Sequence, residues 1–381
     1  MGEFVVNSST APSFGEVRDS GWAVSDIERS AFVRVTYAII ASFGLTGNML
    51  VVFVLFRIPS LRNRTSHFII HLALTDFLTC VWIIPFNLFP GSPALPSGVF
   101  GEMLCRLFIN KFPLWATIFA SVYSLVCVHL ERFVAIVYPM QYKIIFAPGK
   151  SILFMVGCWI IGIISNSYFW LIYSNEEGLC SIQPYPHPAI QRLVGVYTFC
   201  VVYIIPIGFN FFSHKKMIAE LKGKAKVLEN KDISAANLER VPGAKSARRK
   251  EVWQLKTAQE LSNTLLIVVI TFAICWAPNQ IFFFIYNMGA DLPFNTPLYH
   301  TTVIMSLCNS CLNPFIYFFK NKHYRVGLMK ALSPICCSRG LKEKWGSVRT
   351  GPPPTHSGGT ASNSNSVVNV SRDNSFCVSN L

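Results

Sequence analysis

The sequence predicts an all-α membrane protein: a bundle of seven transmembrane helices followed by a short amphipathic eighth helix. Of its 381 residues, 52% are hydrophobic and only 14% are charged, whereas soluble domains carry about a quarter charged residues. The apolar residues are gathered into seven blocks, each long enough to cross a bilayer core of about 30 Å. These blocks are near-continuous and do not alternate with polar residues, which favours helices over the strands of a membrane barrel.

Each expected span is a block with almost no charge, and Asp76 is the only acid within any of them. The spans are Val35–Phe56, Phe68–Phe89, Phe112–Leu130, Ser151–Tyr173, Leu193–Ser213, Leu261–Met288 and Thr296–Phe319. The chain then divides into four parts: an outer tail (1–34), the bundle (35–319, with a cytoplasmic connection at 214–256), the eighth helix (320–333) and a disordered cytoplasmic tail (334–381).

The basic residues set the orientation. Most of the 33 Lys and Arg residues lie in the first, third and fifth connections and in the C-terminal tail. The positive-inside rule therefore places these segments in the cytoplasm and the N-terminus outside, as in a multi-pass protein of the plasma membrane. The net charge of +14 is explained by topology, so nucleic-acid binding need not be invoked.

The cysteines and one asparagine suggest covalent modifications. Of the twelve Cys residues, only Cys105 and Cys180 are expected on the outer face, where an oxidising compartment favours a disulfide between them. Asn7 begins an Asn-Ser-Ser triplet and is a candidate glycosylation site. Cys336 and Cys337 follow the eighth helix and are candidate palmitoylation sites.

Polar residues inside the spans form one expected cluster. A carboxylate at mid-membrane is costly, so Asp76 should be protonated or should hold a cation with polar neighbours. The neighbours expected from the third and seventh helices are Ser121, Asn309, Ser310 and Asn313. We expect a water-filled or sodium-holding cavity here, and the alternative is a hydrogen-bonded structural acid.

One charged pair and three prolines indicate which parts of the bundle are expected to move. Glu131 and Arg132 end the third span, either as a functional pair or as an ordinary helix end that reaches the interface. Pro206, Pro278 and Pro314 each interrupt a span and free a carbonyl one turn earlier, which favours a bundle that bends.

The cytoplasmic segments offer surfaces for binding. The connection 214–256 is long and basic, and we expect a flexible loop flanked by helix extensions that meet acidic lipid headgroups, a docking surface for a cytoplasmic partner, or both. Residues 320–333 place basic and bulky apolar side chains on different faces, as in a helix lying on a membrane. The chain ends in Val378-Ser379-Asn380-Leu381, which could add to the sheet edge of a PDZ domain.

With these residues in place, the chain resembles a rhodopsin-like (class A) G-protein-coupled receptor of the peptide-receptor group. The resemblance rests on six motifs in order on six helices. They are Gly47-Asn48, Leu72-Ala73-Leu74-Thr75-Asp76, Glu131-Arg132-Phe133, Trp159, Phe272-Ala273-Ile274-Cys275-Trp276-Ala277-Pro278 and Asn313-Pro314-Phe315-Ile316-Tyr317.

The resemblance implies roles for these positions. Arg132 would be held by Glu131 at rest and would meet a heterotrimeric G protein after the sixth helix moves outward. Trp276 would lie under the ligand, and Tyr317 would turn inward on activation. The relay from Trp276 would include Phe272, Pro206, Val122 and Pro278. The expected sodium ligands are Asp76, Ser121, Asn309, Ser310 and Asn313, and arrestin and a receptor kinase are expected partners.

The chain departs from the family pattern at three places. Glu131-Arg132-Phe133 stands where Asp-Arg-Tyr is usual, and His214 stands where a Tyr commonly supports the active state. The interval from Cys105 to Arg132 is longer than usual and contains Pro113.

We infer the class of ligand by excluding classes of receptor whose characteristic residues are missing from this chain. The third span lacks the Asp of amine receptors and the seventh lacks the Lys of opsins. Receptors for nucleotides and lipid acids have Arg or Lys in the outer parts of the sixth and seventh helices. This chain has no Arg or Lys at those places, although Lys111 and Arg192 leave that alternative open. A wide aromatic and amide lining suits a short neuropeptide. The expected lining residues are Asn279, Gln280, Phe283, Tyr286 and Tyr299, and the outer acids Glu102, Glu176, Glu177 and Asp291 could attract a basic or amidated peptide.

Two other classes compete with a receptor. An ion-coupled transporter or channel would use Asp76, but we see none of the internal hydropathy repeats typical of transporters. An intramembrane hydrolase would need a nucleophile with a base, or paired acids, within the membrane. The spans contain a single acid, so we expect no enzyme, and no cofactor except an allosteric sodium ion.

Overall fold

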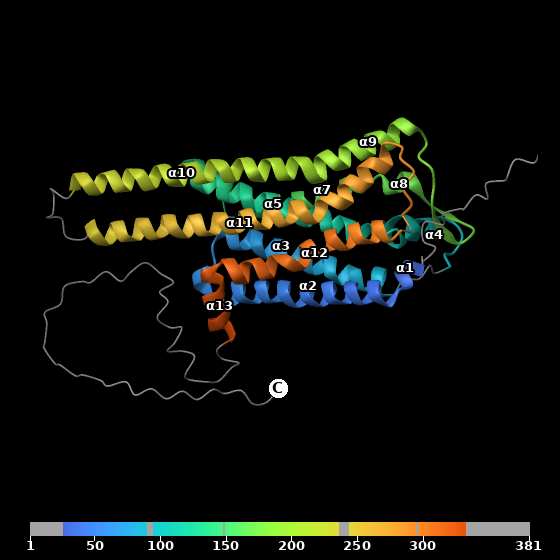
Figure 1. Cartoon of the computed structure of the whole chain (residues 1–381), viewed down its shortest axis with the longest axis horizontal. Helices are drawn as coiled ribbons and strands as arrows, with labels where there is room; N and C mark the ends of the chain where they lie inside the picture. The colour runs from blue at the N-terminus through green and yellow to red at the C-terminus, as the bar shows by residue number, and fades with distance from the viewer. Residues whose placement is uncertain (1–25, 90–93, 148, 236–243, 295, 333–381) are drawn as a thin grey trace, which may run out of the picture.

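The computed structural model describes residues 26–89, 94–147, 149–235, 244–294 and 296–332. Seven helical spans in this part are long and apolar enough to cross a membrane, and they pack side by side as one bundle (Figure 1), which confirms the predicted fold class. Asn7, Cys336, Cys337 and the PDZ-like C-terminus lie outside the described residues.

The elements follow in this order: α1 (Asp26–Arg29), α2 (Ala31–Arg57), η1 (Pro59–Leu61), α3 (Arg64–Ile83), η2 (Ile84–Leu88), α4 (Val99–Leu104), η3 (Cys105–Ile109), α5 (Phe112–Val137), α6 (Pro139–Ile145), α7 (Lys150–Ser165), α8 (Phe169–Ile172), β1 (Tyr173–Glu176), β2 (Leu179–Ile182), α9 (Pro188–Thr198), η4 (Phe199–Ile204), α10 (Ile205–Ala235), α11 (Ala244–Asn287), α12 (Pro297–Lys320) and α13 (Lys322–Leu332). Segments η2, η3 and η4 are π-helical turns at the outer ends of three spans.

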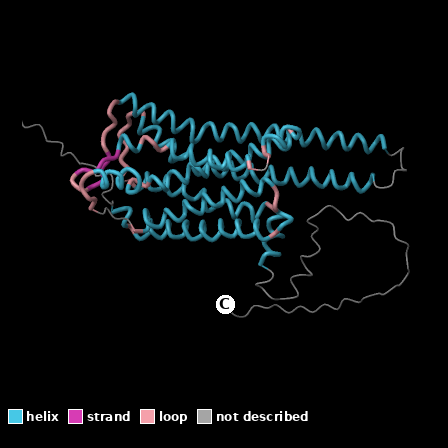
Figure 2. The backbone as a smooth tube through the Cα atoms, turned by 180° about the vertical axis from the view of Figure 1, so that it is seen from behind, coloured by secondary structure: helices cyan, strands magenta, loops and turns pink. Residues whose placement is uncertain are grey.

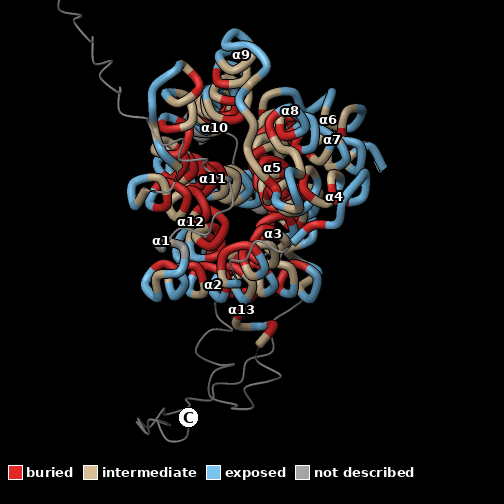
Figure 3. The backbone as a smooth tube through the Cα atoms, turned by 90° about the vertical axis from the view of Figure 1, so that its right-hand side faces the viewer, coloured by how far each residue is buried: buried red, intermediate tan, exposed pale blue. Residues whose placement is uncertain are grey.

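The pattern of buried and exposed residues agrees with a bundle that is surrounded by lipid and whose inward-facing side chains pack against one another. Seen along the bundle, buried positions face its centre and exposed positions form the rim (Figure 3). The main core runs through the middle of the bundle and includes Tyr37, Leu72, Phe272 and Trp276. Large apolar residues such as Phe32 and Leu153 remain exposed, which is normal for helices that face lipid.

The sequence predicted helix extensions on both sides of the connection 214–256, and both are present. Helix α10 continues to Ala235 and α11 already begins at Ala244. The hydropathy criterion stops where charges begin, but Lys, Glu, Ala and Leu are good helix formers in water as well. Helix therefore continues beyond the apolar block on both sides of the connection (Figure 1).

The fourth span covers Lys150–Ile172, in agreement with the predicted Ser151–Tyr173, but its helix is interrupted. Helix α7 ends at Ser165, where Asn166 donates from Nδ2 to the carbonyl of Gly162 at 2.7 Å. The chain then forms α8 and an antiparallel pair of strands that was not predicted. In this pair Tyr173 lies opposite Ile182 and Asn175 opposite Cys180, at one end of the bundle (Figure 2).

The eighth helix is present as α13, which turns across the end of the bundle beside α2 (Figure 1). Asn321 separates it from α12, and its Oδ1 accepts from the backbone N–H of Tyr324 at 3.0 Å. This is a helix-capping bond. Gly327 lies against Leu61 and Val54, so α13 packs closely on the first span and its connection.

Glycine sets the distance between α5 and α7. A Cβ on Gly162 would lie only 2.7 Å from the carbonyl oxygen of Ala116, which is backbone and cannot move aside cheaply. We expect Gly162→Ala to destabilise the protein by about 1–3 kcal/mol, the usual cost of overpacking. The measurement is the melting temperature of the purified protein, together with its surface expression.

Gly157 provides the matched control. It lies on the same helix, and a Cβ there would meet nothing within 4 Å. Gly157→Ala should leave the melting temperature unchanged or raise it slightly, since Ala favours helix over Gly by about 1 kcal/mol. Equal effects of the two substitutions would contradict the close packing of α5 and α7.

Candidate functional site

The polar cluster expected around Asp76 forms inside the bundle. Ser121 of α5 donates from Oγ to Asp76 Oδ1 at 2.6 Å, and Asn313 of α12 donates from Nδ2 to Asp76 Oδ2 at 2.8 Å. Asp76 is fully buried, and Ser310 also hydrogen-bonds to it. Asn48 of α2 joins the cluster indirectly, by donating to the backbone carbonyl of Ser310 at 2.8 Å. One carboxylate thus connects α3, α5 and α12.

Two oxygens near this carboxylate have no hydrogen-bond partner. Oδ1 of Asn313 and Oδ1 of Asn309 are buried and accept nothing from the described residues. A buried acceptor without a partner is costly, and a hard cation such as sodium satisfies carboxylate, hydroxyl and amide oxygens together. The residues present therefore fit a sodium ion, which Asp76, Ser121, Ser310, Asn309 and Asn313 would hold.

At the other end of α5, Glu131 is the centre of a second polar cluster. Arg132 donates to it from Nε at 2.7 Å and from an Nη at 3.0 Å. Thr65 of α3 donates to it at 2.8 Å, and Tyr142 of α6 donates its hydroxyl at 2.5 Å. Glu131 is fully buried and the Arg132 side chain is 17% exposed. We call these four residues the inner lock, because they hold Arg132 against the bundle.

Tyr142 reaches the inner lock from α6, in the connection between α5 and α7. The guanidinium of Arg64 lies over its ring, 5.3 Å from the centroid. Burial, and next the hydrogen bond to Glu131, raise the pKa of Tyr142 to about 12. The phenol therefore remains protonated and able to donate throughout the physiological pH range.

An aromatic column in the main core of the bundle is centred on Trp276 of α11. Its ring contacts Phe272 (centroids 5.8 Å apart) and Phe119 (6.2 Å), and the Trp side chain is fully buried. The other predicted relay residues, Val122 and Pro206, are also buried. Pro278 lies within α11 one half-turn beyond Trp276. The column thus occupies the centre of the bundle, where a relay would have to run.

Two further contacts concern the predicted switch residues. Tyr317 is buried, its hydroxyl has no partner among the described residues, and its ring faces Tyr324 of α13 at 6.3 Å. Phe133 lies outside the inner lock and contacts Phe212 of α10 at 6.2 Å. Pro314 lies inside α12, next to Gly47 of α2.

His214, the residue that replaces the family's usual Tyr, lies near a second histidine. His214 of α10 and His129 of α5 are close enough to influence one another electrostatically. Nδ1 of His214 and Nε2 of His129 are buried without a hydrogen-bond partner in the described structure. His129 does contact a backbone carbonyl through Nδ1, that of Leu125 at 3.0 Å. The sequence alone gave no reason to pair these histidines.

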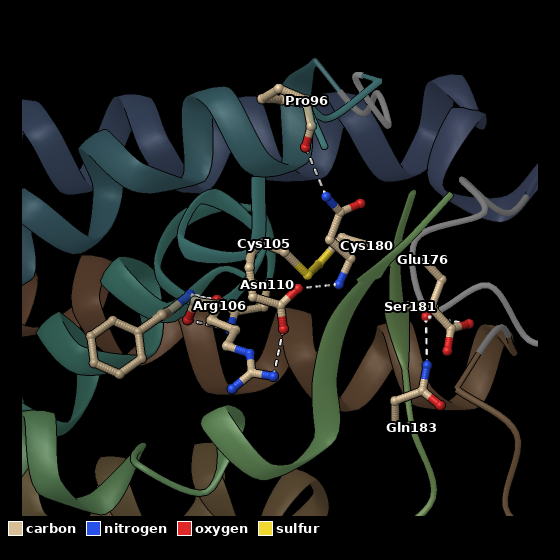
Figure 4. Close-up of a disulfide and its surroundings, with 11 residues drawn as sticks. Pro96, Cys105, Arg106, Asn110, Glu176, Cys180, Ser181 and Gln183 are labelled. Atoms are coloured by element: carbon tan, nitrogen blue, oxygen red, sulfur yellow. Dashed lines mark hydrogen bonds and ion pairs between the residues drawn. A yellow bond between two sulfur atoms is a disulfide. The ribbon is translucent and has the colours of Figure 1, made fainter. Parts of the chain in front are cut away.

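The disulfide expected between Cys105 and Cys180 is present (Figure 4). It joins η3, which precedes α5, to β2. The surrounding segment is tied down further, since Asn175 donates from Nδ2 to the carbonyl of Pro96 at 2.9 Å and from its backbone N–H to Glu102 at 2.7 Å. The strand pair is therefore fixed over the outer end of the bundle.

A cavity of about 140 Å³ opens beneath this strand pair. All five residues predicted to bind the ligand line it: Asn279, Gln280, Phe283, Tyr286 and Tyr299. The other members come from the third span and the turn before it, the α7–α9 segment, the α11–α12 connection and α12. They are Asn110, Lys111, Trp115, Phe119, Tyr168, Phe169, Ile172, Tyr173, Ile182, Tyr185, Thr198, Phe294 and His300. Of these, the sequence pointed only to Lys111, and the rest were not predicted.

The outer acids do not belong to this cavity. Among the described residues that line it there is no Asp or Glu. Glu102 forms an ion pair with Arg106 at 2.5 Å, and Glu176 accepts from Ser181 at 3.4 Å. Glu177 and Asp291 are exposed. The expectation that acids would attract the ligand is therefore not supported for the cavity itself.

An outer cavity and an inner charged lock, joined by one helix bundle, define a multi-pass membrane receptor. A family model described as "7 transmembrane receptor (rhodopsin family)" matches residues 47–317. The chain belongs to this family, whose members are signalling receptors and not enzymes.

Individual relatives agree with the family. The chain is 29% identical to galanin receptor 2b of Danio rerio, over 82% of this chain and 77% of that protein. It is 25% identical to somatostatin receptor type 4 of Rattus norvegicus, over 87% and 80%. It is also 25% identical to the [Phe13]-bombesin receptor of Bombina orientalis, over 87% and 81%.

Removal of the Tyr142 hydroxyl should weaken the inner lock. Hydrogen bonds to charged groups contribute about 1.5–3 kcal/mol when buried. Because Tyr142 is only partly buried, we expect Tyr142→Phe to cost the resting state about 1 kcal/mol, which corresponds to about a fivefold rise in basal nucleotide exchange. Tyr138→Phe is the control, since this exposed ring contacts Phe133. Unchanged basal exchange in Tyr142→Phe would mean that Tyr142 does not restrain Arg132.

Proposed function

We propose that this protein is a plasma-membrane receptor that binds an extracellular peptide and activates a heterotrimeric G protein. In this proposal the N-terminus and the disulfide end face outward. The observation that carries the proposal is the position of the cavity and the inner lock at opposite ends of one bundle. The aromatic column of Trp276, Phe272 and Phe119 lies between them.

A peptide is the ligand class that the lining supports best. Phenols, amides and aromatic rings surround the cavity, and such groups bind both the backbone and the side chains of a peptide. The printed names of the relatives agree, since galanin, somatostatin and bombesin receptors are named after peptides. We infer the same class of ligand for this chain.

The mechanism we propose is a shift between two states of the bundle. At rest, Glu131 holds Arg132 through two hydrogen bonds, while Thr65 and Tyr142 hold Glu131. A ligand that packs above Trp276 and prefers a different position of α11 stabilises a state in which that helix bends at Pro278. Only unequal affinity for the two states can drive this change.

Release of Arg132 is the step that the G protein would recognise. The guanidinium has five donors and is always charged, so it can form several hydrogen bonds with backbone carbonyls at the C-terminal end of a partner helix. The exposed basic residues of α10 and α11, among them Lys215, Lys222 and Arg249, would lie against acidic lipids or the same partner. Arrestin, a receptor kinase and a PDZ protein belong to this proposal as further cytoplasmic partners.

The role of Arg132 can be tested directly. Arg132→Ala should abolish ligand-stimulated nucleotide exchange on a G protein, with at most a small change in ligand affinity. The assay compares exchange and binding in membranes from cells that express each variant. Lys143→Ala removes an exposed cation of α6, the helix that follows α5, and should retain exchange. If Arg132→Ala still stimulates exchange, Arg132 does not contact the G protein.

Sodium should favour the resting state through the cluster around Asp76. The ion would hold oxygens of α3, α5 and α12 together, and allosteric couplings are typically 1–3 kcal/mol. We therefore expect sodium chloride to lower basal exchange by roughly fivefold relative to N-methylglucamine chloride. Asp76→Asn should remove this difference because the amide carries no charge.

Ser124→Ala is the matched control for the sodium effect. Ser124 lies one turn inward from Ser121 on α5 and bonds to His71 at 2.7 Å and to a backbone carbonyl, not to Asp76. The sodium effect should persist in this variant. A sodium effect that survives Asp76→Asn would exclude this carboxylate as the site.

A further inference from the structure

A groove of about 360 Å³ opens on the lipid-facing side of the bundle, where α2, α12 and α13 meet. The rings of Phe43 on α2 and Phe315 on α12 contact each other in its wall, with their centroids 5.7 Å apart. Leu50, Phe319 and Leu328 continue the lining toward the inner end of the bundle. Among the described residues that line the groove there is no Lys, Arg, Asp or Glu. A hydrocarbon chain therefore fits this groove better than a polar ligand does.

Cations border the groove at its inner end. Arg57 lies in the last turn of α2, about two turns beyond Leu50 and on the same helix face. Lys320 ends α12 directly after Phe319 and is exposed. Arg325 of α13 donates from Nη1 to the carbonyl of Phe319 at 3.0 Å, which holds its guanidinium at the end of α12. The three helices that form the groove thus each contribute a positive side chain.

No acidic residue of these helices offsets the charge. The sequences of α2, α12 and α13 contain no Asp or Glu. Asp26 and Glu28 belong to α1, at the opposite end of α2, and Asp76 of the neighbouring α3 is fully buried inside the bundle. The electrostatic potential at the inner end of the groove is therefore positive, and it favours an anionic group.

The apolar lining and the cations match the two parts of a membrane lipid. Basic side chains at the ends of spans reach the level of the lipid headgroups, and the groove extends from there toward the middle of the bilayer. A guanidinium binds phosphate through several N–H groups, and the bond to Phe319 occupies only one of the five N–H donors of Arg325. In the proposed orientation, this end of the bundle meets the cytoplasmic leaflet, which is rich in anionic lipids.

We propose that this groove is a binding site for an anionic phospholipid, with one acyl chain along the apolar lining and the phosphate at Arg57, Lys320 and Arg325. The inference rests on the membrane-spanning bundle and is independent of the ligand of the outer cavity. The lipid joins α13 to α2 and α12, because all three helices line the groove. It therefore stabilises the position of α13, whose Tyr324 lines the groove and packs its ring toward Tyr317 at 6.3 Å.

The experiment uses the full-length receptor in nanodiscs of dioleoylphosphatidylcholine, to which a second component is added. This component is dioleoylphosphatidylserine, which is anionic, or dioleoyltrimethylammonium propane, which is cationic and has the same acyl chains. Free glycerophosphoserine supplies the anionic headgroup without acyl chains. The measurements are the melting temperature at increasing fractions of the added component and the lipid that stays bound in native mass spectrometry. We expect only phosphatidylserine to raise the melting temperature and to stay bound, because it alone supplies both the chain and the anion.

Three variants test the contact with the headgroup. Arg57→Gln, Lys320→Gln and Arg325→Gln should each raise the phosphatidylserine fraction needed for half of the stabilisation by roughly fivefold, the effect of one cation near a membrane surface. Each variant is compared with its own melting temperature in phosphatidylcholine alone, so that a loss of intrinsic stability does not count. Lys150→Gln is the matched control, because Lys150 is an exposed cation at the inner start of α7, which does not line the groove. It should leave the fraction unchanged.

Thr46→Phe tests the groove itself. Thr46 lines the groove and is exposed, and its hydroxyl donates to the carbonyl of Ser42 on its own helix at 2.7 Å. A ring at this position fills the groove without removing a printed bond between helices, and it should abolish the stabilisation by phosphatidylserine. Met49→Phe is the matched control, because Met49 is 47% exposed on the same helix and does not line the groove. This variant should keep the stabilisation.

Other occupants of the groove give different results. Stabilisation by phosphatidylserine that is equal in all variants indicates a general effect of charge, and equal stabilisation by glycerophosphoserine shows that no acyl chain is involved. Cholesterol that stabilises the receptor when phosphatidylserine does not assigns the groove to a sterol. A receptor dimer that Thr46→Phe disrupts, without any effect of lipid, assigns the groove to a second copy of the chain. Each of these four results overturns the inference.

The response to peptides separates this inference from the proposed function. A receptor that shows peptide-stimulated nucleotide exchange but no preference for phosphatidylserine overturns the lipid site and leaves the peptide receptor standing. A receptor that binds phosphatidylserine in the groove but responds to no peptide overturns the proposed ligand class and leaves the lipid site standing.

Discussion

The absence of water from the bilayer interior is the constraint on which the rest of this structure depends. A polar side chain within a span must find its partner on another helix, because lipid offers none. Asp76 connects α3, α5 and α12, Asn48 connects α2 to α12, and Glu131 connects α5, α3 and α6. The few hydrophilic groups therefore decide which helices face each other, while apolar packing supplies most of the buried area. The same bonds have to rearrange if the bundle is to change state, so the stabilising groups and the switching groups are the same residues.

Hydropathy and charge were sufficient to predict the seven spans and the eighth helix, because both follow from the solvent around each segment. They were insufficient where partners decide the structure. Thr65 and Tyr142 are unremarkable in sequence, and only the fold brings them to Glu131. The β1–β2 pair lacks alternating hydrophobicity, since its strands read Tyr-Ser-Asn-Glu and Leu-Cys-Ser-Ile, so its pattern gave no signal. Helix extensions on both sides of the connection 214–256 were predicted, but their length was not, because membrane criteria end at charged residues and helix propensity does not.

The outer cavity shows how far residue type alone can guide the assignment of a site. Asn279, Gln280, Phe283, Tyr286 and Tyr299 were selected by type and position, and all line the cavity. The outer acids were equally plausible from sequence, but Glu102 is engaged with Arg106, and the described lining contains no acid. From the sequence, Lys111 was considered only as a residue that left a nucleotide or lipid-acid ligand open as an alternative. Its inclusion in the lining depends on a left-handed backbone at the start of α5, and this could not be read from composition or periodicity.

The length of α11 has a mechanical consequence. The helix is continuous from Ala244 to Asn287, and its proline, Pro278, lies towards its C-terminal end. From Pro278 to Arg248 the rise of an α-helix gives an arm of about 45 Å. A tilt of about 10° at the proline would therefore sweep the far end through roughly 8 Å, whereas the ring of Trp276, close to the fulcrum, would shift by less than about 1 Å. In the proposed mechanism, the long extension of α11 would therefore amplify the movement, because displacement grows with distance from the pivot, and so does the leverage that a protein bound to the far end can exert in return.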